Sequence, residues 1–296
     1  MPCSFPKRAK AISEPLAGRG AVVVGGSRGV GLAVAELLAA QGAGVVLNGR
    51  DADAATEAAQ GITRAVAFPG SPADPAVANA LIDTCIQEFG RIDVLVNCAG
   101  TAGLASESIL KATSAQFRDL LDAHLGTAFE TCRVAAPHMV AQGGGSIINT
   151  SSFAFLGDYG GTGYPAGKGG VNGLTLAIAA ELKEHGVRAN VVCPGAKTRL
   201  STGSEYEAHI VELNRRGLLD EVSMQTALDA PPPEYVAPTY AYLAGDLAKD
   251  ITGQIFIAAG GFVGRFDRQS PSLLGYRDHH DAPPWSVDEI AAMVTR

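Results

Sequence analysis

The stretch AVVVGGSRGVGLAVAELLAAQG (residues 21–42) decides the fold of this chain. A short apolar run ends in a glycine turn, and the apolar residues after the turn recur at helical spacing until Gly42. A second apolar run, GVVLNG (44–49), follows at once. This order predicts a strand, a helix and a second strand parallel to the first, because parallel strands need a crossover that is usually helical.

The same alternation continues along the chain. Apolar runs at 64–68, 92–97, 146–152, 188–195 and 253–261 are separated by helical patterns near 52–61, 75–89, 114–141 and 163–185. Such alternation is typical of a parallel sheet covered by helices on both faces. We therefore predict an α/β fold with a doubly wound, seven-stranded parallel sheet in a single domain.

Composition narrows the classes of partner. The net charge is −7 and no basic run occurs, which argues against nucleic acid or an anionic membrane as partner. No stretch approaches the ~18 apolar residues of a membrane span. Residues 1–15 lack the apolar segment of a signal peptide and are expected to form a loose arm.

The positions of the cysteines and histidines argue against structural disulfides and against a metal site. Cys3, Cys85, Cys98, Cys132 and Cys193 are scattered and form no CxxC pair. They are expected to be reduced thiols of a cytoplasmic protein. No group of histidines has metal-ligand spacing, so we expect no metal site.

The glycine turn predicts a cofactor. Gly25, Gly29 and Gly31 have the spacing GxxxGxG at the end of the first strand. Glycine lets the backbone approach a pyrophosphate, and the following helix presents free amides and the positive end of its dipole. A glycine turn alone is a weak signal, but its place between the first strand and first helix of a βαβ unit predicts a dinucleotide site.

The end of the second strand indicates which dinucleotide binds. A carboxylate there would bond the ribose 2′-hydroxyl of NAD and repel a 2′-phosphate. That end reads LNGR (47–50), and the first acid is Asp51. Arg50 and Arg28 are both able to bind a 2′-phosphate as planar donors. We expect NADP, with NAD as the alternative if Asp51 turns toward the ribose.

A second motif, YPAGK (164–168), carries acid–base chemistry. It follows a strand that ends in Ser151 and Ser152. Tyr164 and Lys168 are four residues apart, so on a helix they lie on one face and point into one pocket. A lysine beside a phenol lowers the pKa of the phenol, which would let Tyr164 exchange a proton near neutral pH.

With these motifs placed, the chain resembles the short-chain dehydrogenase/reductase family over residues 16–262. The matching segments, in family order, are VGGSRGVG (24–31) for TGxxxGxG, NCAG (97–100) for NNAG, NTSS (149–152) for the serine strand, YPAGK for YxxxK, PGAKT (194–198) for PGxxxT and ITGQIFIAAGG (251–261) for the last strand. The resemblance implies a Rossmann-type domain over 16–262, followed by a C-terminal extension, 263–296.

The resemblance also implies residue roles. Tyr164 would exchange a proton with the substrate oxygen, Lys168 would lower the pKa of Tyr164 and bind the nicotinamide ribose, and a serine would hold the substrate carbonyl. The implied cofactor contacts are Gly25, Ser27, Arg28, Gly29, Val30, Gly31, Arg50, Ser71, Asn97, Ala99, Gly100, Tyr164, Lys168, Pro194, Gly195 and Thr198.

Four departures from the family pattern are visible. Val24 replaces a threonine, and Ser71 stands where an acid would bond adenine. His124, in HLGTAF (124–129), replaces an asparagine that anchors a water relay to the lysine. It either continues the relay or is only a buried histidine.

The fourth departure concerns the substrate serine. Counting along the strand from Gly145 gives Ser152, whereas counting back from Tyr164 gives Ser151. We favour Ser152, because strand register is stiffer than loop length.

Two segments break the alternation of strands and helices. Residues 199–233 follow the sixth strand at its carboxyl end and predict a substrate lid, with a plain connector as the alternative. In the extension, Ser286 and Glu289 have capping-box spacing and predict a short helix. The extension either covers the pocket, docks on a neighbouring subunit or is a surface appendage.

These features predict an NADP(H)-dependent oxidoreductase that moves a hydride between nicotinamide and a ketone or secondary alcohol, most simply a carbonyl reductase (ketoreductase). The expected pocket wall, Phe153, Phe155, Tyr159, Leu200 and Tyr206, favours a hydrophobic or aromatic substrate or is ordinary packing. Resemblance adds acyl-thioester or polyketide-like compounds. The alternatives are NADP binding without turnover, or dehydration or epimerisation by the same Tyr–Lys pair.

The helix that starts at Tyr164 also predicts an assembly. It is apolar around much of its circumference and carries Gly167, Gly169, Gly170 and Gly173. By resemblance this surface joins subunits, so we expect a homotetramer or a homodimer.

Overall fold

The computed structural model of the chain describes residues 14–101, 108–159, 161–268 and 270–295. The predicted arm, 1–15, and Cys3 lie outside these residues except for the last two positions of the arm. The chain divides into a large unit that ends at Phe266 and a small unit, Asp267–Arg296.

One sheet organises the large unit. Its strands are β1 (Gly20–Val24), β2 (Gly44–Gly49), β3 (Ala65–Pro69), β4 (Val94–Asn97), β5 (Gly145–Thr150), β6 (Val187–Gly195), β7 (Ile255–Ala259) and β8 (Phe262–Phe266). They lie in the order β3-β2-β1-β4-β5-β6-β7-β8, and all neighbours are parallel except β7 and β8. The doubly wound fold is thus confirmed, with one strand more than predicted. The sequence FVGRF of β8 does not by itself predict a strand. Its strand conformation comes from pairing with the free edge of β7.

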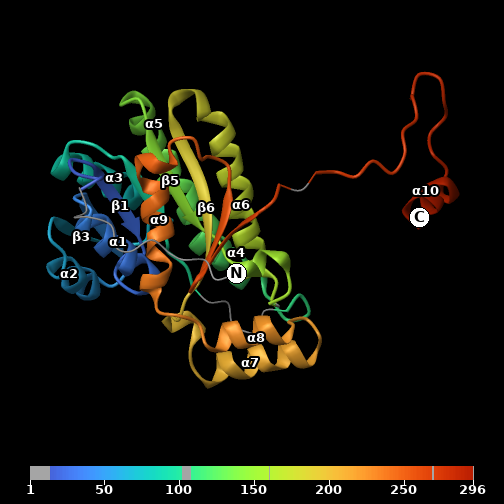
Figure 1. Ribbon diagram of the computed structural model, residues 1–296, viewed down its shortest axis with the longest axis horizontal. Coiled ribbons are helices and arrows are strands. Elements are labelled where there is room, and N and C mark those ends of the chain that lie inside the picture. The colour runs from blue at the N-terminus through green and yellow to red at the C-terminus, as the bar shows by residue number, and fades with distance from the viewer. Residues whose placement is uncertain (1–13, 102–107, 160, 269, 296) are drawn as a thin grey trace, which may run out of the picture. The chain divides into compact units, whose positions relative to one another are not determined.

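Helices connect the strands (Figure 1). The large unit contains α1 (Gly29–Ala40), α2 (Ala52–Gln60), α3 (Pro75–Phe89), α4 (Ser114–Leu121), α5 (Thr127–Ala141), α6 (Gly163–Glu181), α7 (Ser204–Arg215), α8 (Glu221–Leu228) and α9 (Ala237–Ala244). A π-helical turn, η1 (Asp122–Gly126), joins α4 to α5, so the long helical stretch predicted over 114–141 is continuous. The single-turn helices are η2 (Phe153–Leu156), η3 (Lys183–His185), η4 (Arg199–Ser201), η5 (Pro233–Tyr235) and η6 (Asp246–Ala248).

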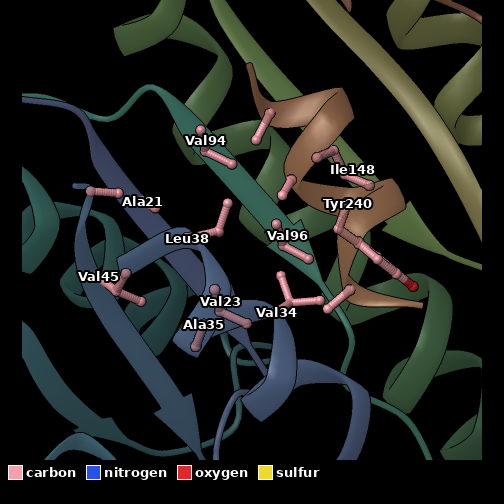
Figure 2. Packing of buried hydrophobic residues seen from close by; sticks show 14 of the residues in the cluster. Ala21, Val23, Val34, Ala35, Leu38, Val45, Val94, Val96, Ile148 and Tyr240 are labelled. Carbon is pink, nitrogen blue, oxygen red and sulfur yellow. The ribbon is translucent and has the colours of Figure 1, made fainter. Parts of the chain in front are cut away.

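The two faces of the sheet carry separate cores. Ala21 and Val23 of β1 pack with α1 and α9, whereas Val22 and Val24 pack with α3, α5 and α6. Alternate residues of one strand point to opposite faces, so a strand covered on both sides must be apolar throughout. Figure 2 shows the first of these cores, where Tyr240 lies among aliphatic side chains. This packing fixes the strand ends on which the site is built.

The segment predicted to be an irregular lid is helical. Helices α7 and α8 lie side by side and enclose a small cluster around Ile210 and Leu213. Two positions of α7 and none of α8 are buried, which is why the apolar periodicity of the sequence is weak here. The backbone amide of Lys197 donates to the carbonyl of Pro231 at 2.7 Å, so the two ends of the segment meet at its base.

The small unit contains α10 (Val287–Val294). Its first turn has the predicted capping box between Ser286 and Glu289, which confirms the short terminal helix. The guanidinium of Arg277 stacks on Trp285, 3.7 Å from the ring centroid, and pairs with Glu289 at 2.6 Å. In the described part of the chain, no helix is long and apolar enough to cross a membrane.

Candidate active site

The predicted site residues gather at the carboxyl ends of the central strands. In the strand order, β2 and β3 lie on one side of β1, and β4 and the later strands lie on its other side. The order therefore reverses between β1 and β4, which is the switch point of a doubly wound sheet. Ligands of such sheets bind in the crevice outside these strand ends.

The glycine turn after β1 is tightly packed. Gly25 has a φ of +73°, and a Cβ on it would lie 2.7 Å from the Cα of Ala99. A Cβ on Gly31 would overlap the carbonyl of Gly25, so α1 packs directly on the turn. Both positions therefore require glycine, which brings the backbone of the turn against the end of β4.

The start of α1 fits a pyrophosphate group. Its N-cap, Arg28, makes no side-chain cap hydrogen bond, and the first turn contains no acidic residue. The first amides of the helix are thus left without a protein cap, at the positive end of the helix dipole. This is the donor set that a dinucleotide phosphate needs.

Strand β2 contains no carboxylate at its carboxyl end. Asn48 is buried and donates to the carbonyls of Phe68 and Gly70, at 3.0 and 3.1 Å. Asp51 pairs with Arg28 at 2.7 Å and caps α2 through the amide of Ala54. These contacts hold the pKa of Asp51 below its usual range, the Ala54 amide being the larger cause and Arg28 a further one.

The remaining predicted contacts of the adenosine side surround this turn. Arg50 and Ser71 are exposed at the ends of β2 and β3. A Cβ on Gly49 would lie 2.7 Å from the Oγ of Ser27, which places Ser27 against the end of β2. Val30 is partly buried in the first turn of α1.

The structure brings Tyr164, Lys168 and Ser152 together. Tyr164 and Lys168 both stand on α6, and the ammonium lies 5.8 Å from the centroid of the phenol ring. The Lys168 Nζ donates to the carbonyl of Thr150 at 2.9 Å. Burial raises the pKa of Tyr164, and a hydrogen bond from Ser152 acts in the opposite direction. The pKa of this phenol in the free chain is thus raised, not lowered as predicted, because burial is the largest influence on it.

Lys168 itself is fully enclosed. Burial lowers its pKa to about 8, with Cys98 and Cys193 opposing that shift. The ammonium thus keeps its proton at neutral pH and loses it just above.

The two serines have different surroundings. Ser152 accepts a hydrogen bond from the amide of Ala154 at 3.2 Å and begins η2 beside Tyr164. Ser151 is buried and donates to the carbonyl of Lys168 at 3.1 Å, away from the phenol. Of the two serines, Ser152 is thus the one that acts on the Tyr164 phenol.

Asn97 was predicted to contact the cofactor, but its side chain belongs to a buried hydrogen-bond network. Its side chain is buried, donates to Asn149 at 2.8 Å and accepts from Thr131 at 2.9 Å. Asn149 in turn donates to Thr175 at 2.9 Å. This network joins β4, β5, α5 and α6 beneath the site, so the Asn97 side chain is not free to line the adenosine.

His124 lies in η1, beside both catalytic candidates on α6. Its ring meets that of Tyr164 edge-on, with centroids 5.0 Å apart. Its Nε2 lies 3.0 Å from the carbonyl of Thr101, and since a carbonyl only accepts, Nε2 carries the proton and Nδ1 is an acceptor. Burial, and then Lys168, lower the pKa of His124 to about 3, so the ring is neutral.

The Nδ1 of His124 is buried without a partner among the described residues. A Cβ on Gly100 would lie 3.0 Å from this nitrogen and 3.8 Å from the Nζ of Lys168. Because this residue is a glycine, a small space is left beside it. The acceptor Nδ1 of His124 and the cationic Nζ of Lys168 both border this space.

The loop after β6 completes the crevice. A Cβ on Gly29 would lie 3.3 Å from the Cγ2 of Thr198, so PGAKT (194–198) adjoins the glycine turn. The Thr198 hydroxyl caps η4, and Pro194 and Gly195 pair with β7.

Comparison with known proteins agrees with this geometry. The sequence model of the short chain dehydrogenase family matches residues 19–206. The chain belongs to the short-chain dehydrogenase family. A crystal structure of a short chain dehydrogenase from Mycobacterium avium superposes with a TM-score of 0.77 at 29% identity, covering 95% of this chain and 94% of that one.

Two curated relatives illustrate the family. The short-chain reductase protein NovJ of Streptomyces niveus is 35% identical over 81% of this chain and 92% of its own length. The cyclohexanol dehydrogenase of an Acinetobacter strain is 32% identical over 86% of this chain and 99% of its own. The chain is therefore an oxidoreductase that acts on alcohols or ketones, with a nicotinamide cofactor of the family's type.

Three tyrosines of the dehydrogenase lie near one another. Tyr159 and Tyr206 both pack on the cluster between α7 and α8, and His209 bonds the carbonyl of Tyr159 at 3.1 Å. Burial raises the pKa of Tyr206 to about 12, with smaller contributions from Tyr159 and Tyr164. Tyr159 and Tyr206 thus pack on the cluster between α7 and α8, whereas Leu200 is exposed.

The other two predicted wall residues of the dehydrogenase contact strand β8. Phe153 and Phe155 pack edge-on against Phe266 of β8, at centroid distances of 6.1 and 5.1 Å. No sequence signal pointed to Phe266, because β8 lies beyond the segment that resembles the family.

Thr150 was also missed. Its carbonyl holds Lys168, and its hydroxyl lies 2.9 Å from the buried hydroxyl of Tyr240. Thr150 belongs to the motif NTSS (149–152), but it holds Lys168 through its backbone carbonyl, which no side-chain pattern predicts.

The described cysteines of the dehydrogenase are free, as predicted. Burial raises the pKa of Cys98 to about 11 and that of Cys193 to about 12, so both stay protonated beside Lys168. In the small unit, Asp278, His279 and His280 hold ligand atoms within 4.8 Å of one another, and all three are exposed.

Proposed function

We propose that this dehydrogenase is an NADP(H)-dependent carbonyl reductase that interconverts a ketone and a secondary alcohol. The observation that carries the proposal is the convergence of Ser152, Tyr164 and Lys168 at the carboxyl end of the sheet, next to an uncapped α1. The bound cofactor supplies a hydride to the carbonyl carbon.

The residues of the chain supply the proton and the orientation. Ser152 holds the carbonyl oxygen by a hydrogen bond, and Tyr164 donates its phenolic proton to the oxygen as it becomes negative. Lys168, held by the Thr150 carbonyl, keeps a positive charge near the phenolate that results. The raised pKa of Tyr164 keeps the phenol protonated at neutral pH, so it can donate this proton.

The direct test is consumption of NADPH by the purified full chain with a panel that includes cyclohexanone and acetophenone. We expect ketone-dependent oxidation of NADPH. Tight NADPH binding with no turnover would support the nucleotide-binding alternative instead. Conversion of a substrate without any change in the cofactor would support dehydration or epimerisation.

NADP is the proposed cofactor because Arg28 and Arg50 are exposed at the N-cap of α1 and the end of β2, and β2 itself contains no acidic residue. The Arg28–Asp51 pair is half exposed on both sides, and such a surface pair contributes little to stability because solvent screens it. A phosphate can therefore displace Asp51 from Arg28 at small cost, while Arg50 is exposed.

Replacing Arg28 and Arg50 together by alanine is expected to raise KM for NADPH by at least about 100-fold, since charge-assisted hydrogen bonds are worth about 1.5–3 kcal/mol each. Initial-rate kinetics with NADPH and NADH measure the change, and KM for NADH should hardly move. Arg133→Ala, an ion-paired arginine on α5, is the control. Equal losses with both cofactors would contradict a role in reading the 2′-phosphate.

We propose that His124 continues the relay that the family builds with asparagine. Its neutral Nδ1 accepts from a water that Lys168 also bonds, in the space beside Gly100. His124→Leu is expected to lower kcat about 10-fold, the scale of one lost hydrogen bond. His124→Asn should retain most activity in the same assay; equal loss in both variants would assign His124 to packing alone.

The substrate is proposed to be a hydrophobic or aromatic ketone. Tyr159 and Tyr206 pack on the cluster between α7 and α8, and Tyr206 lies close enough to Tyr164 for the two phenols to influence each other. One relative is named for cyclohexanol, an apolar alcohol, which supports this class. Activity on charged ketones but on none of the apolar ones would refute the assignment.

The apolar surface that includes part of α6 supports a homo-oligomer. Gly169 and Gly173 face open space, while Gly170 packs on Leu125. A groove of about 480 Å³ beside them is lined by Leu121, Leu125, Phe129, Leu174 and their neighbours. We propose that this face joins subunits into a dimer or tetramer; a monomer by light scattering would contradict it.

A further inference from the structure

The eighth strand makes a contact that the predicted domain did not include. Phe266 is the last residue of β8, where it pairs with Ile255 of β7. Its ring packs edge-on against two rings of η2, Phe155 at 5.1 Å and Phe153 at 6.1 Å between centroids. A residue from the end of the large unit thus supports the short helix that follows the substrate serine.

The two phenylalanines flank the group that orients Ser152. Ala154 lies between them, is buried, and donates its amide proton to the Oγ of Ser152 at 3.2 Å. The Ser152 side chain also lies beside Tyr164 and lowers the pKa of that phenol. The hydroxyl is therefore held between the backbone of η2 and the phenol, and any shift of η2 moves it relative to Tyr164.

Helix η2 has little internal support. It is a single 3₁₀ turn whose backbone bonds are Phe155 to Ser152 and Gly157 to Ala154, at 3.1 and 3.0 Å. Such turns have poor hydrogen-bond geometry and take their position from packing. The rings of Phe153 and Phe155 are the part of η2 that Phe266 fixes.

We propose that Phe266 is a positioning residue for Ser152, and that β8 thereby belongs to the support of the active site. The inference rests on the proposed carbonyl reductase function, because Ser152 is there the group that holds the substrate oxygen. It extends that function to a strand beyond the segment that resembles the family.

The experiment compares Phe266→Ala with Phe262→Ala in the full chain. Phe262 is the matched control: it is an aromatic residue of the same strand, 57% exposed, and its ring lies over Gly264 of β8. We expect Phe266→Ala to lower kcat for ketone reduction at least 10-fold, since a displacement of about 1 Å can cost 100-fold. KM for NADPH should stay within about twofold of the wild type, because the cofactor turn is far along the sheet order. Phe266→Tyr, which keeps the ring, should restore the rate.

A second readout does not depend on turnover. The hydrogen bond from Ser152 lowers the pKa of Tyr164, so loosening Ser152 should move the titration of this phenol to higher pH. Ultraviolet difference titration measures it, with each variant compared against the same variant carrying Tyr164→Phe. The other groups near the phenol, Lys168, His124, Cys193 and Tyr206, are unchanged in every arm.

The outcomes separate the two proposals. A wild type that reduces no ketone would overturn the proposed function, while the phenol titration would still decide the role of Phe266. An unshifted titration in Phe266→Ala, or equal losses of kcat in the Phe266 and Phe262 variants, would overturn the positioning role. Loss of NADPH binding together with kcat would also overturn it, as a general structural defect.

Discussion

Replacing Tyr164 by phenylalanine is expected to lower kcat for ketone reduction by about 10³-fold, the scale of positioned general-acid catalysis. The ring remains packed against His124, so the variant removes only the transferable proton. Steady-state kinetics at neutral pH measure the loss.

The affinity for NADPH is the control for this variant. Fluorescence titration should give a dissociation constant close to that of the wild type, because a group that acts in the transition state alone changes kcat without changing binding. Turnover that survives in Tyr164→Phe would mean that the proton comes from elsewhere and that the site has been misassigned.

Ser152→Ala is expected to lower kcat by about 100-fold, the loss seen when one donor to a developing oxyanion is removed. Ser151→Ala should cost far less activity, since the Ser151 hydroxyl donates to the Lys168 carbonyl inside the protein. Its removal is expected to reduce the free energy of unfolding by about 1 kcal/mol.

The pair of serine variants is decisive when measured side by side. Thermal unfolding should register the Ser151 change, and kinetics should register the Ser152 change. The reverse pattern, with the larger loss of kcat in Ser151→Ala, would show that the loop count from Tyr164 gives the right serine.

The fold could be predicted because its signals are local. The apolar run of β1, the turn at Gly25 and the helix α1 are adjacent in sequence, and each follows from short-range stereochemistry. The place of Tyr164 beside Lys168 follows from helical spacing alone.

The parts that escaped prediction depend on contacts between distant residues. The pairing of Arg28 with Asp51 and the network around Asn97 involve side chains that meet only after the strands align. The pKa of Tyr164 depends on burial by elements on several sides, which a one-dimensional pattern does not contain. Strand β8 forms because β7 offers a free edge, not because FVGRF is a strong strand sequence.

The most direct measurement uses NADPH that carries deuterium at both C4 positions of the nicotinamide, so that transfer from either face moves a label. After incubation of the wild-type chain with cyclohexanone or another accepted ketone, mass spectrometry locates the label. We expect an alcohol with one deuterium on the carbinol carbon, formed in step with the oxidised cofactor and lost in Tyr164→Phe. A product without label, or label that stays in the cofactor while substrate is converted, would contradict carbonyl reduction by this site.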